Sequence, residues 1–264
     1  MGRIQATFER LKQRGETALI PFITAGDPDL ATTEKLIHTL VENGADLIEL
    51  GFPFSDPMAD GPTIQTASER ALEGGTTLPK VLELVARVRE HTNVPLVLMG
   101  YYNPLFSYGP ERFAVDAAAA GVDGLLLVDL PAEEAGEVRS YLQQAGISLI
   151  QLLAPTTPPQ RMQRLVADAE GFVYFVSMTG VTGASQIDAV AIEQQVRDLQ
   201  QLSPVPVAVG FGIASPADAA AVGCFADAVV VGSALVKVVA AYGASPELVA
   251  RVGAFVRSLK EGLR

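Results

Sequence analysis

Two carboxylates, Glu49 and Asp60, are the side chains of this sequence best placed for acid–base chemistry. Glu49 ends the strand-like run "ADLIE" between two apolar neighbours, Ile48 and Leu50. An inward-pointing carboxyl group at such a position loses its hydration, which raises its pKa and lets it both give and take a proton near neutral pH. The alternative is a structural carboxylate with a partner inside the fold.

An acidic loop follows Glu49. The segment "ELGFPFSDPMADGP" (residues 49–62) contains three prolines and two glycines and cannot be helical along its length. It is long enough to bring Asp60 back over Glu49. Asp56 and Asp60 could equally be turn residues, because Asp before Pro or Gly is common in turns.

Three glycine-rich segments could bind an anion. They are "GVTGA" (180–184), "GFGIAS" (210–215) and "VGSA" (231–234). A glycine turn that leads into a helix N-terminus exposes backbone N–H groups, which favour phosphate. Ordinary strand-to-helix turns are the alternative. Five apolar residues near predicted strand ends are consistent with a flat apolar ligand, or with core packing: Phe22, Met99, Leu126, Tyr174 and Phe211.

Eight strand-like runs, alternating with amphipathic helical segments, must position these residues. The runs are 18–26, 45–52, 95–102, 124–130, 148–155, 171–177, 206–213 and 227–234. Their near-continuous apolar character predicts parallel strands buried on both faces. Eight such units in one chain predict an α/β fold, a (β/α)8 TIM barrel forming a single domain over residues 1–264. Chemistry in such barrels lies at the C-terminal ends of the strands.

Further helices are expected around this plan. We predict an N-terminal helix and extra short helices after strands 2 and 8, with a separate last helix beginning at "SPELV" (245–249). The alternative architecture is an open doubly wound sheet. It usually carries a G-x-G-x-x-G turn after its first strand, where this chain has "TAGDPD".

Composition narrows the function classes. The chain has 264 residues, a net charge of −11 and dispersed basic residues, which argues against nucleic-acid binding. One cysteine, Cys224, leaves no internal disulfide. The N-terminal segment does not have the pattern of a signal peptide and no run has the pattern of a membrane span, so we expect a cytoplasmic protein with no membrane partner.

The whole chain resembles the alpha subunit of tryptophan synthase. The similar blocks occur in the family's order and spacing, and the segment around strand 2 is the most specific: "PFITAGDP", "ELGFPFSDPMADGPTIQ", "VLMGYYNP", "LLLVDLP", "LLAPTTP", "GFVYFVS", "GVTGA", "VGFGI" and "VVGSALV". The resemblance implies a lyase that cleaves indole-3-glycerol phosphate by a retro-aldol reaction to indole and D-glyceraldehyde 3-phosphate.

By the family's pattern, Glu49 would be the general acid and base, and Asp60 would hold the indole N–H. The indole pocket would be lined by Phe22, Ile64, Met99, Tyr101, Leu126 and Tyr174. The phosphate would be bound by backbone N–H groups of Gly183, Gly212, Gly232 and Ser233, and Gly210 and Phe211 would also contact the substrate. Thr182 would lie on a loop that closes the site. Met178 stands where some relatives carry a basic residue.

The family's partner is a beta subunit that carries pyridoxal phosphate, in an alpha2-beta2 tetramer. The resemblance therefore implies no cofactor and no metal in this chain, a small phosphate ester as substrate, and a partner interface near Pro53 and Asp56.

Three other functions stay open. They are a free-standing lyase that releases indole, a catalytically silent subunit that only activates a partner, and a phosphate-handling isomerase. The isomerase is disfavoured because the predicted sixth strand ends in "FVSMTG", without a histidine, lysine or carboxylate.

Overall fold

The computed structural model describes residues 1–177, 189–210 and 212–264. The strands in these ranges are all parallel and form one sheet in the order β5-β4-β3-β2-β1-β9-β8-β7-β6. They are β1 (Ala18–Thr24), β2 (Ile48–Gly51), β3 (Leu96–Gly100), β4 (Gly124–Leu127), β5 (Ser148–Leu149), β6 (Gln151–Leu153), β7 (Val173–Val176), β8 (Val207–Gly210) and β9 (Ala228–Val231).

The sheet curls into a nearly closed barrel. Its two edges, β5 and β6, are consecutive in the chain and are separated only by Ile150. The backbone N–H of Ile150 donates to the carbonyl of Leu125, 2.8 Å away, so this residue continues the pairing with β4 while β6 pairs with β7. The predicted fifth strand is therefore two short strands, and the predicted barrel is confirmed. The open doubly wound sheet is wrong.

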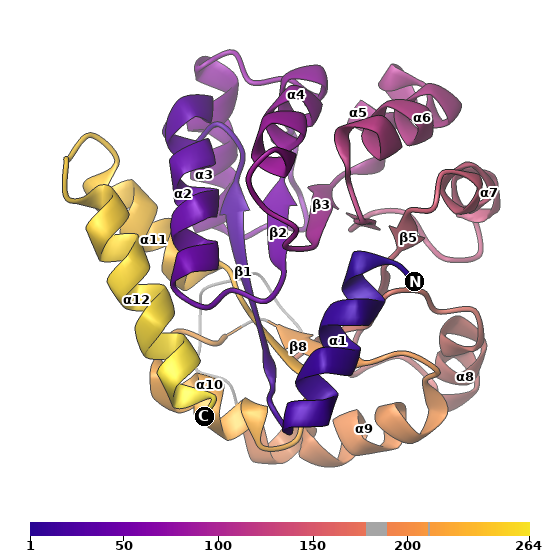
Figure 1. The fold of residues 1–264 in the computed structure, drawn as a ribbon. Helices are drawn as coiled ribbons and strands as arrows, with labels where there is room; N and C mark the ends of the chain where they lie inside the picture. The colour runs from indigo at the N-terminus through magenta and orange to yellow at the C-terminus, as the bar shows by residue number, and fades with distance from the viewer. Residues whose placement is uncertain (178–188, 211) are drawn as a thin grey trace.

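Helices surround the barrel on the outside (Figure 1). They are α1 (Arg3–Arg14), α2 (Leu30–Glu42), α3 (Pro62–Glu73), α4 (Leu78–Arg89), α5 (Tyr102–Tyr108), α6 (Pro110–Ala120), α7 (Gly136–Gln144), α8 (Pro159–Ala167), α9 (Ala189–Leu202), α10 (Pro216–Gly223), α11 (Ser233–Tyr242) and α12 (Leu248–Gly262).

The predicted extra helices are α1, α3 and α11, and the last helix differs at its start. It begins at Leu248, the fourth residue of "SPELV", rather than at Ser245, because Ser245 forms a turn in which its Oγ accepts from the N–H of Glu247. Helix α5 was not expected, since Pro104 lies within it. Proline is tolerated there because the first turn needs no intrahelical N–H bond.

Helix α1 covers one end of the barrel. Its apolar residues Ile4, Phe8 and Leu11 pack in one cluster with inward-facing residues at the start of strands, among them Ala18 and Ala228. Figure 1 shows α1 lying across the ring of strands. The N-terminal end is thus filled, which leaves the C-terminal end for a site. Because one barrel organises all these elements, we propose that residues 1–264 form a single domain.

No helix in the described ranges is long and apolar enough to cross a membrane. No cluster of three or more histidine, cysteine, aspartate or glutamate side chains suited to a metal ion occurs among the described residues.

Candidate active site

Glu49 lies inside the barrel, on β2. Parallel pairing places it between Phe22 of β1 and Val97 of β3, and its side chain is 0% exposed. Neither carboxylate oxygen has a hydrogen-bond partner in the described part of the chain. Burial alone raises the pKa of Glu49 to about 8, because nothing there stabilises the charged form. Glu49 is therefore mainly protonated at neutral pH, and the described residues include no partner of the kind that a paired structural carboxylate would have.

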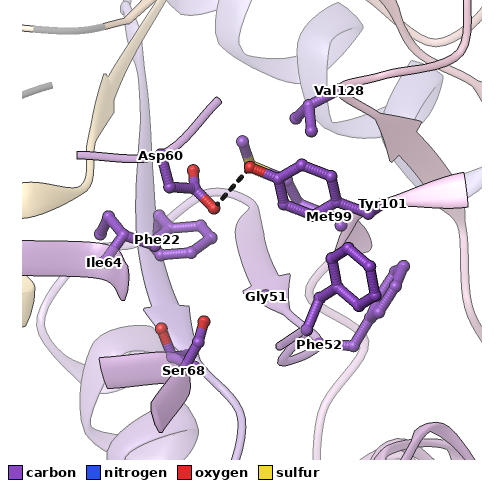
Figure 2. Close-up of a pocket in the computed structure, with 12 residues that line it drawn as sticks. Phe22, Gly51, Phe52, Asp60, Ile64, Ser68, Met99, Tyr101 and Val128 are labelled. Carbon is purple, nitrogen blue, oxygen red and sulfur yellow. Dashed lines mark hydrogen bonds between the residues drawn. The ribbon is translucent and has the colours of Figure 1, made fainter. Parts of the chain in front are cut away.

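Asp60 lies at the end of the acidic loop, just before α3. Its Oδ2 accepts a hydrogen bond from the Tyr101 hydroxyl at 3.1 Å (Figure 2). Burial raises the pKa of Asp60 to about 6, although the Tyr101 bond acts in the opposite direction. At neutral pH Asp60 is thus mainly ionised while Glu49 is mainly protonated. Two carboxyl groups with separated pKa values can take different parts in one reaction.

Tyr101 also holds the backbone of the acidic loop. Its hydroxyl accepts from the N–H of Ala59 at 2.9 Å, while Gln65 of α3 donates to the carbonyl of Asp60 at 2.8 Å. These bonds connect the loop to β3 and to α3. The sequence predicts Tyr101 only as a wall of the pocket, and its role in fixing Asp60 comes from the structure.

A pocket opens beside Asp60 at the C-terminal end of the barrel. The pocket is small, and part of its space is open to solvent. It is lined by Phe22, Thr24, Gly51, Phe52, Phe54, Asp60, Ile64, Ser68, Met99, Gly100, Tyr101 and Val128. Figure 2 shows aromatic and aliphatic side chains on several sides of it.

Four of the predicted pocket residues lie together here: Phe22, Ile64, Met99 and Tyr101. Leu126 and Tyr174 are not part of the pocket lining and lie in the buried cluster inside the barrel, against which Met99 packs. Burial and then the charges of Glu49 and Asp60 raise the pKa of Tyr174 well above its usual value. Tyr174 is therefore close to both carboxyl groups.

Several residues of the pocket lining were not predicted from the sequence. Their spacing from predicted pocket residues could have indicated two of them, Thr24 and Ser68. Thr24 follows Phe22 by two positions on β1 and so shares its face. Ser68 follows Ile64 by one helical turn on α3. Phe52, Phe54 and Val128 come from strand ends, where loop geometry decides orientation.

Gly51 is required for close packing in this pocket. A Cβ atom at this position would lie 2.6 Å from the ring of Phe22, too near for any side chain to fit without movement. The glycine therefore lets Phe22 lie against β2, beside Glu49.

On the phosphate side, Gly210 ends β8, and Gly232 immediately precedes the N-terminus of α11. No side chain caps α11, so the N–H groups of its first turn, beginning with Ser233, are available to an anion. A Cβ at Gly232 would lie 3.7 Å from the Phe22 side chain, so this helix end adjoins the pocket. Gly212 has φ +77°, a conformation that favours glycine. Thr182, Gly183, Phe211 and Met178 lie outside the described residues.

The two predicted interface residues differ in exposure. Asp56 is exposed at the tip of the acidic loop, where its carboxylate accepts from the Ser55 hydroxyl. Pro53 is buried within the chain. Met58 of the same loop is 83% exposed. The loop tip thus presents one acidic and one large apolar side chain to solvent.

We predict that replacing Glu49 by glutamine changes the pH dependence of stability. The pKa of Glu49 is about 8 in the folded chain against 4.5 for the ordinary group, so the folded carboxyl keeps a proton that the unfolded one releases. The free energy of unfolding of the wild type therefore falls as pH rises from about 4.5 to about 8. Glutamine has no such loss, so Glu49→Gln should gain roughly 3–4 kcal/mol over the wild type between pH 5 and pH 8.5.

Urea unfolding at a series of pH values measures this difference. The matched control is Glu83→Gln, which changes an exposed carboxyl group on α4. A Glu49→Gln difference as independent of pH as that of the control would contradict the burial of an unpartnered acid.

Comparison with known proteins identifies one family over almost the whole length of the chain. The family model described as "Tryptophan synthase alpha chain" matches residues 8–264. The tryptophan synthase alpha chain of Citrifermentans bemidjiense is 56% identical over 263 residues, covering 100% of this chain and 98% of that protein. That of Geobacter sulfurreducens is 55% identical, with 100% and 99% covered.

Two solved structures support the same family assignment. The crystal structure of tryptophan synthase subunit alpha from Legionella pneumophila superposes with a TM-score of 0.93 at 42% identity, covering 100% of this chain and 98% of that one. The structure of Mycobacterium tuberculosis tryptophan synthase gives a TM-score of 0.91 at 36% identity, again with 100% and 98% covered.

Proposed function

Because the chain belongs to the tryptophan synthase alpha chain family, we propose that Glu49 and Asp60 are its catalytic residues in the family's reaction. That reaction is the aldol-type cleavage of indole-3-glycerol phosphate to indole and D-glyceraldehyde 3-phosphate, a step of L-tryptophan biosynthesis. The observation that carries the assignment is the fully buried, unpartnered carboxyl group of Glu49 at the barrel's catalytic end.

Glu49 acts first as an acid and then as a base. Its carboxyl proton goes to C3 of the indole ring, which makes the ring cationic. Glu49 then takes the proton of the hydroxyl group on the adjacent side-chain carbon. The oxygen electrons form the aldehyde C=O as the bond to C3 breaks, and the bonding pair returns to the ring. Glu49 gives one proton and takes one back, so it ends the reaction in its starting form. A pKa of about 8 suits a group that must both lose and regain a proton.

Asp60 binds the ring and stabilises its charge. As an ionised carboxylate held by Tyr101, it accepts the indole N–H and offsets the positive charge that C3 protonation creates. The apolar walls from Phe22, Ile64 and Met99 hold the ring and exclude water, which strengthens this electrostatic interaction.

The phosphate group binds at the glycine-rich side. We propose that backbone N–H groups at Gly210, Gly212, Gly232 and Ser233 receive it, with the end of α11 as the anchor. Gly183, Phe211 and Thr182 complete this side by the family's pattern. The phosphate and the indole ring then lie on either side of Phe22, which adjoins Gly232 and lines the pocket.

The partner is the beta subunit of tryptophan synthase, and we propose an alpha2-beta2 tetramer. Exposed Asp56 and Met58 supply a charge and an apolar contact at the loop tip, while buried Pro53 fixes the path of the loop.

Pyridoxal phosphate belongs to the beta subunit. The cleavage involves no net oxidation or reduction and needs only proton transfers that carboxyl groups can perform, so we propose that this chain needs neither a cofactor nor a metal. We place it in the cytoplasm.

Indole release from indole-3-glycerol phosphate tests the function directly. We expect slow release by the purified chain, faster release when a beta subunit is added, and a loss of at least about 10³-fold in Glu49→Gln. Glu83→Gln, exposed on α4, is the matched control and should retain activity. Rapid release that is indifferent to the partner would indicate a free-standing lyase, and no release under either condition a silent subunit.

A second experiment tests the phosphate anchor. Ser233 is the first residue of α11, and a proline at this position would have no N–H to donate to the phosphate. We expect Ser233→Pro to weaken competitive inhibition by glycerol phosphate about tenfold or more, because a hydrogen bond to a charged group is lost. Ser233→Ala keeps the N–H and should change inhibition little. Equal inhibition constants in the two variants would place the phosphate elsewhere. Valine at Gly212 is a poorer test, because φ +77° would strain the backbone.

A further inference from the structure

Thr24 of β1 carries a buried hydroxyl group with nothing to bind. Its side chain is 3% exposed, and Oγ1 has no hydrogen-bond partner among the described residues. Within the same ranges, only the two carboxylate oxygens of Glu49 share this condition. Leaving a buried hydroxyl unpaired costs stability, and valine would fill the same volume without that cost. Such a group calls for an explanation.

The hydroxyl belongs to the pocket. Thr24 pairs with Gly51 in the sheet, and both residues line the cavity that holds Asp60. Ser68 of α3, 5% exposed, brings a second hydroxyl-bearing side chain to the same lining. In Figure 2 the side chain of Ser68 lies well apart from the carboxylate of Asp60, with the ring of Phe22 between them. The other side chains of the lining, apart from the Asp60–Tyr101 pair, are apolar.

Asp60 takes the ring N–H in the proposed function, and this N–H is the only hydrogen-bonding group of an unsubstituted indole ring. A hydroxyl elsewhere in the lining then finds no partner on the unsubstituted ring, and a polar substituent on the ring would supply one. A buried site with an unpaired hydroxyl group favours a ligand that completes the hydrogen bond over one that leaves it open.

We propose that Thr24 is a specificity-determining residue that makes the pocket accept substrates with a hydroxyl group on the six-membered ring of the indole. This inference rests on the proposed function, because it uses the same pocket and the same orientation of the ring. The substituent donates to or accepts from Thr24 Oγ1, and Ser68 contributes a second polar contact on the α3 side. The substrate class is therefore indole glycerol phosphates with or without a ring hydroxyl.

The test compares Thr24→Val with the wild type on five substrates. These are indole-3-glycerol phosphate and its four hydroxylated derivatives, isomers of one another that each carry one hydroxyl group on a carbon of the six-membered ring. The readout is kcat/KM of each isomer divided by that of the parent, so that any effect common to all substrates cancels. We expect the ratio of at least one isomer to fall about tenfold in Thr24→Val, as loss of one hydrogen bond predicts. Thr24→Ser keeps the hydroxyl and should retain the ratio.

Ratios that are the same in wild type and Thr24→Val for all four isomers would overturn the proposal. If Thr24→Val does not fold, the kcat/KM values of the wild-type protein alone provide the test. Preference for a hydroxyl over a methyl group at the same ring carbon supports the role of Thr24, and equal or lower kcat/KM for every hydroxylated isomer contradicts it. Failure of the wild type to cleave the parent substrate would instead refute the proposed function.

Discussion

Desolvation of a single carboxyl group, that of Glu49, is the constraint on which the site depends. The nearly closed sheet buries this group completely, and none of the described residues gives it a hydrogen bond. A charge there is costly, so the carboxyl group is mainly protonated at neutral pH. In the proposed function, this cost in stability provides a proton donor at neutral pH.

The acidic loop has the opposite task. It must hold Asp60 charged within reach of an apolar pocket, which requires support for a carboxylate near a surface that does not favour it. Tyr101 supplies that support from the position immediately after β3, and Gln65 fixes the backbone from α3. Pro53 and Pro57 limit the freedom of the loop, which reduces the conformational entropy lost when the carboxylate is positioned. The two acids differ in protonation because one is supported and the other is not.

Much of this arrangement could be predicted from the sequence. Apolar runs alternating with amphipathic helices predict the barrel, and the position of Glu49 between Ile48 and Leu50 predicts its burial. The break of the fifth strand at Ile150 could not be predicted, because closure of the barrel, rather than local propensity, determines it. The bond from Tyr101 to Asp60 joins residues 41 positions apart and leaves no local pattern. Leu126 and Tyr174 show the limit of strand-end reasoning, since both lie below the pocket.

The most direct test is a measurement of the pKa of Glu49 itself. Carbon-13 labelling of the glutamate side-chain carboxyls, with Glu49→Gln to assign the signal, allows this group to be followed from pH 4 to pH 10 by NMR. We predict a titration near pH 8, as burial without a partner requires. A carboxyl carbon that titrates below pH 5 would show that Glu49 is charged at neutral pH, and it would contradict its assignment as the proton donor.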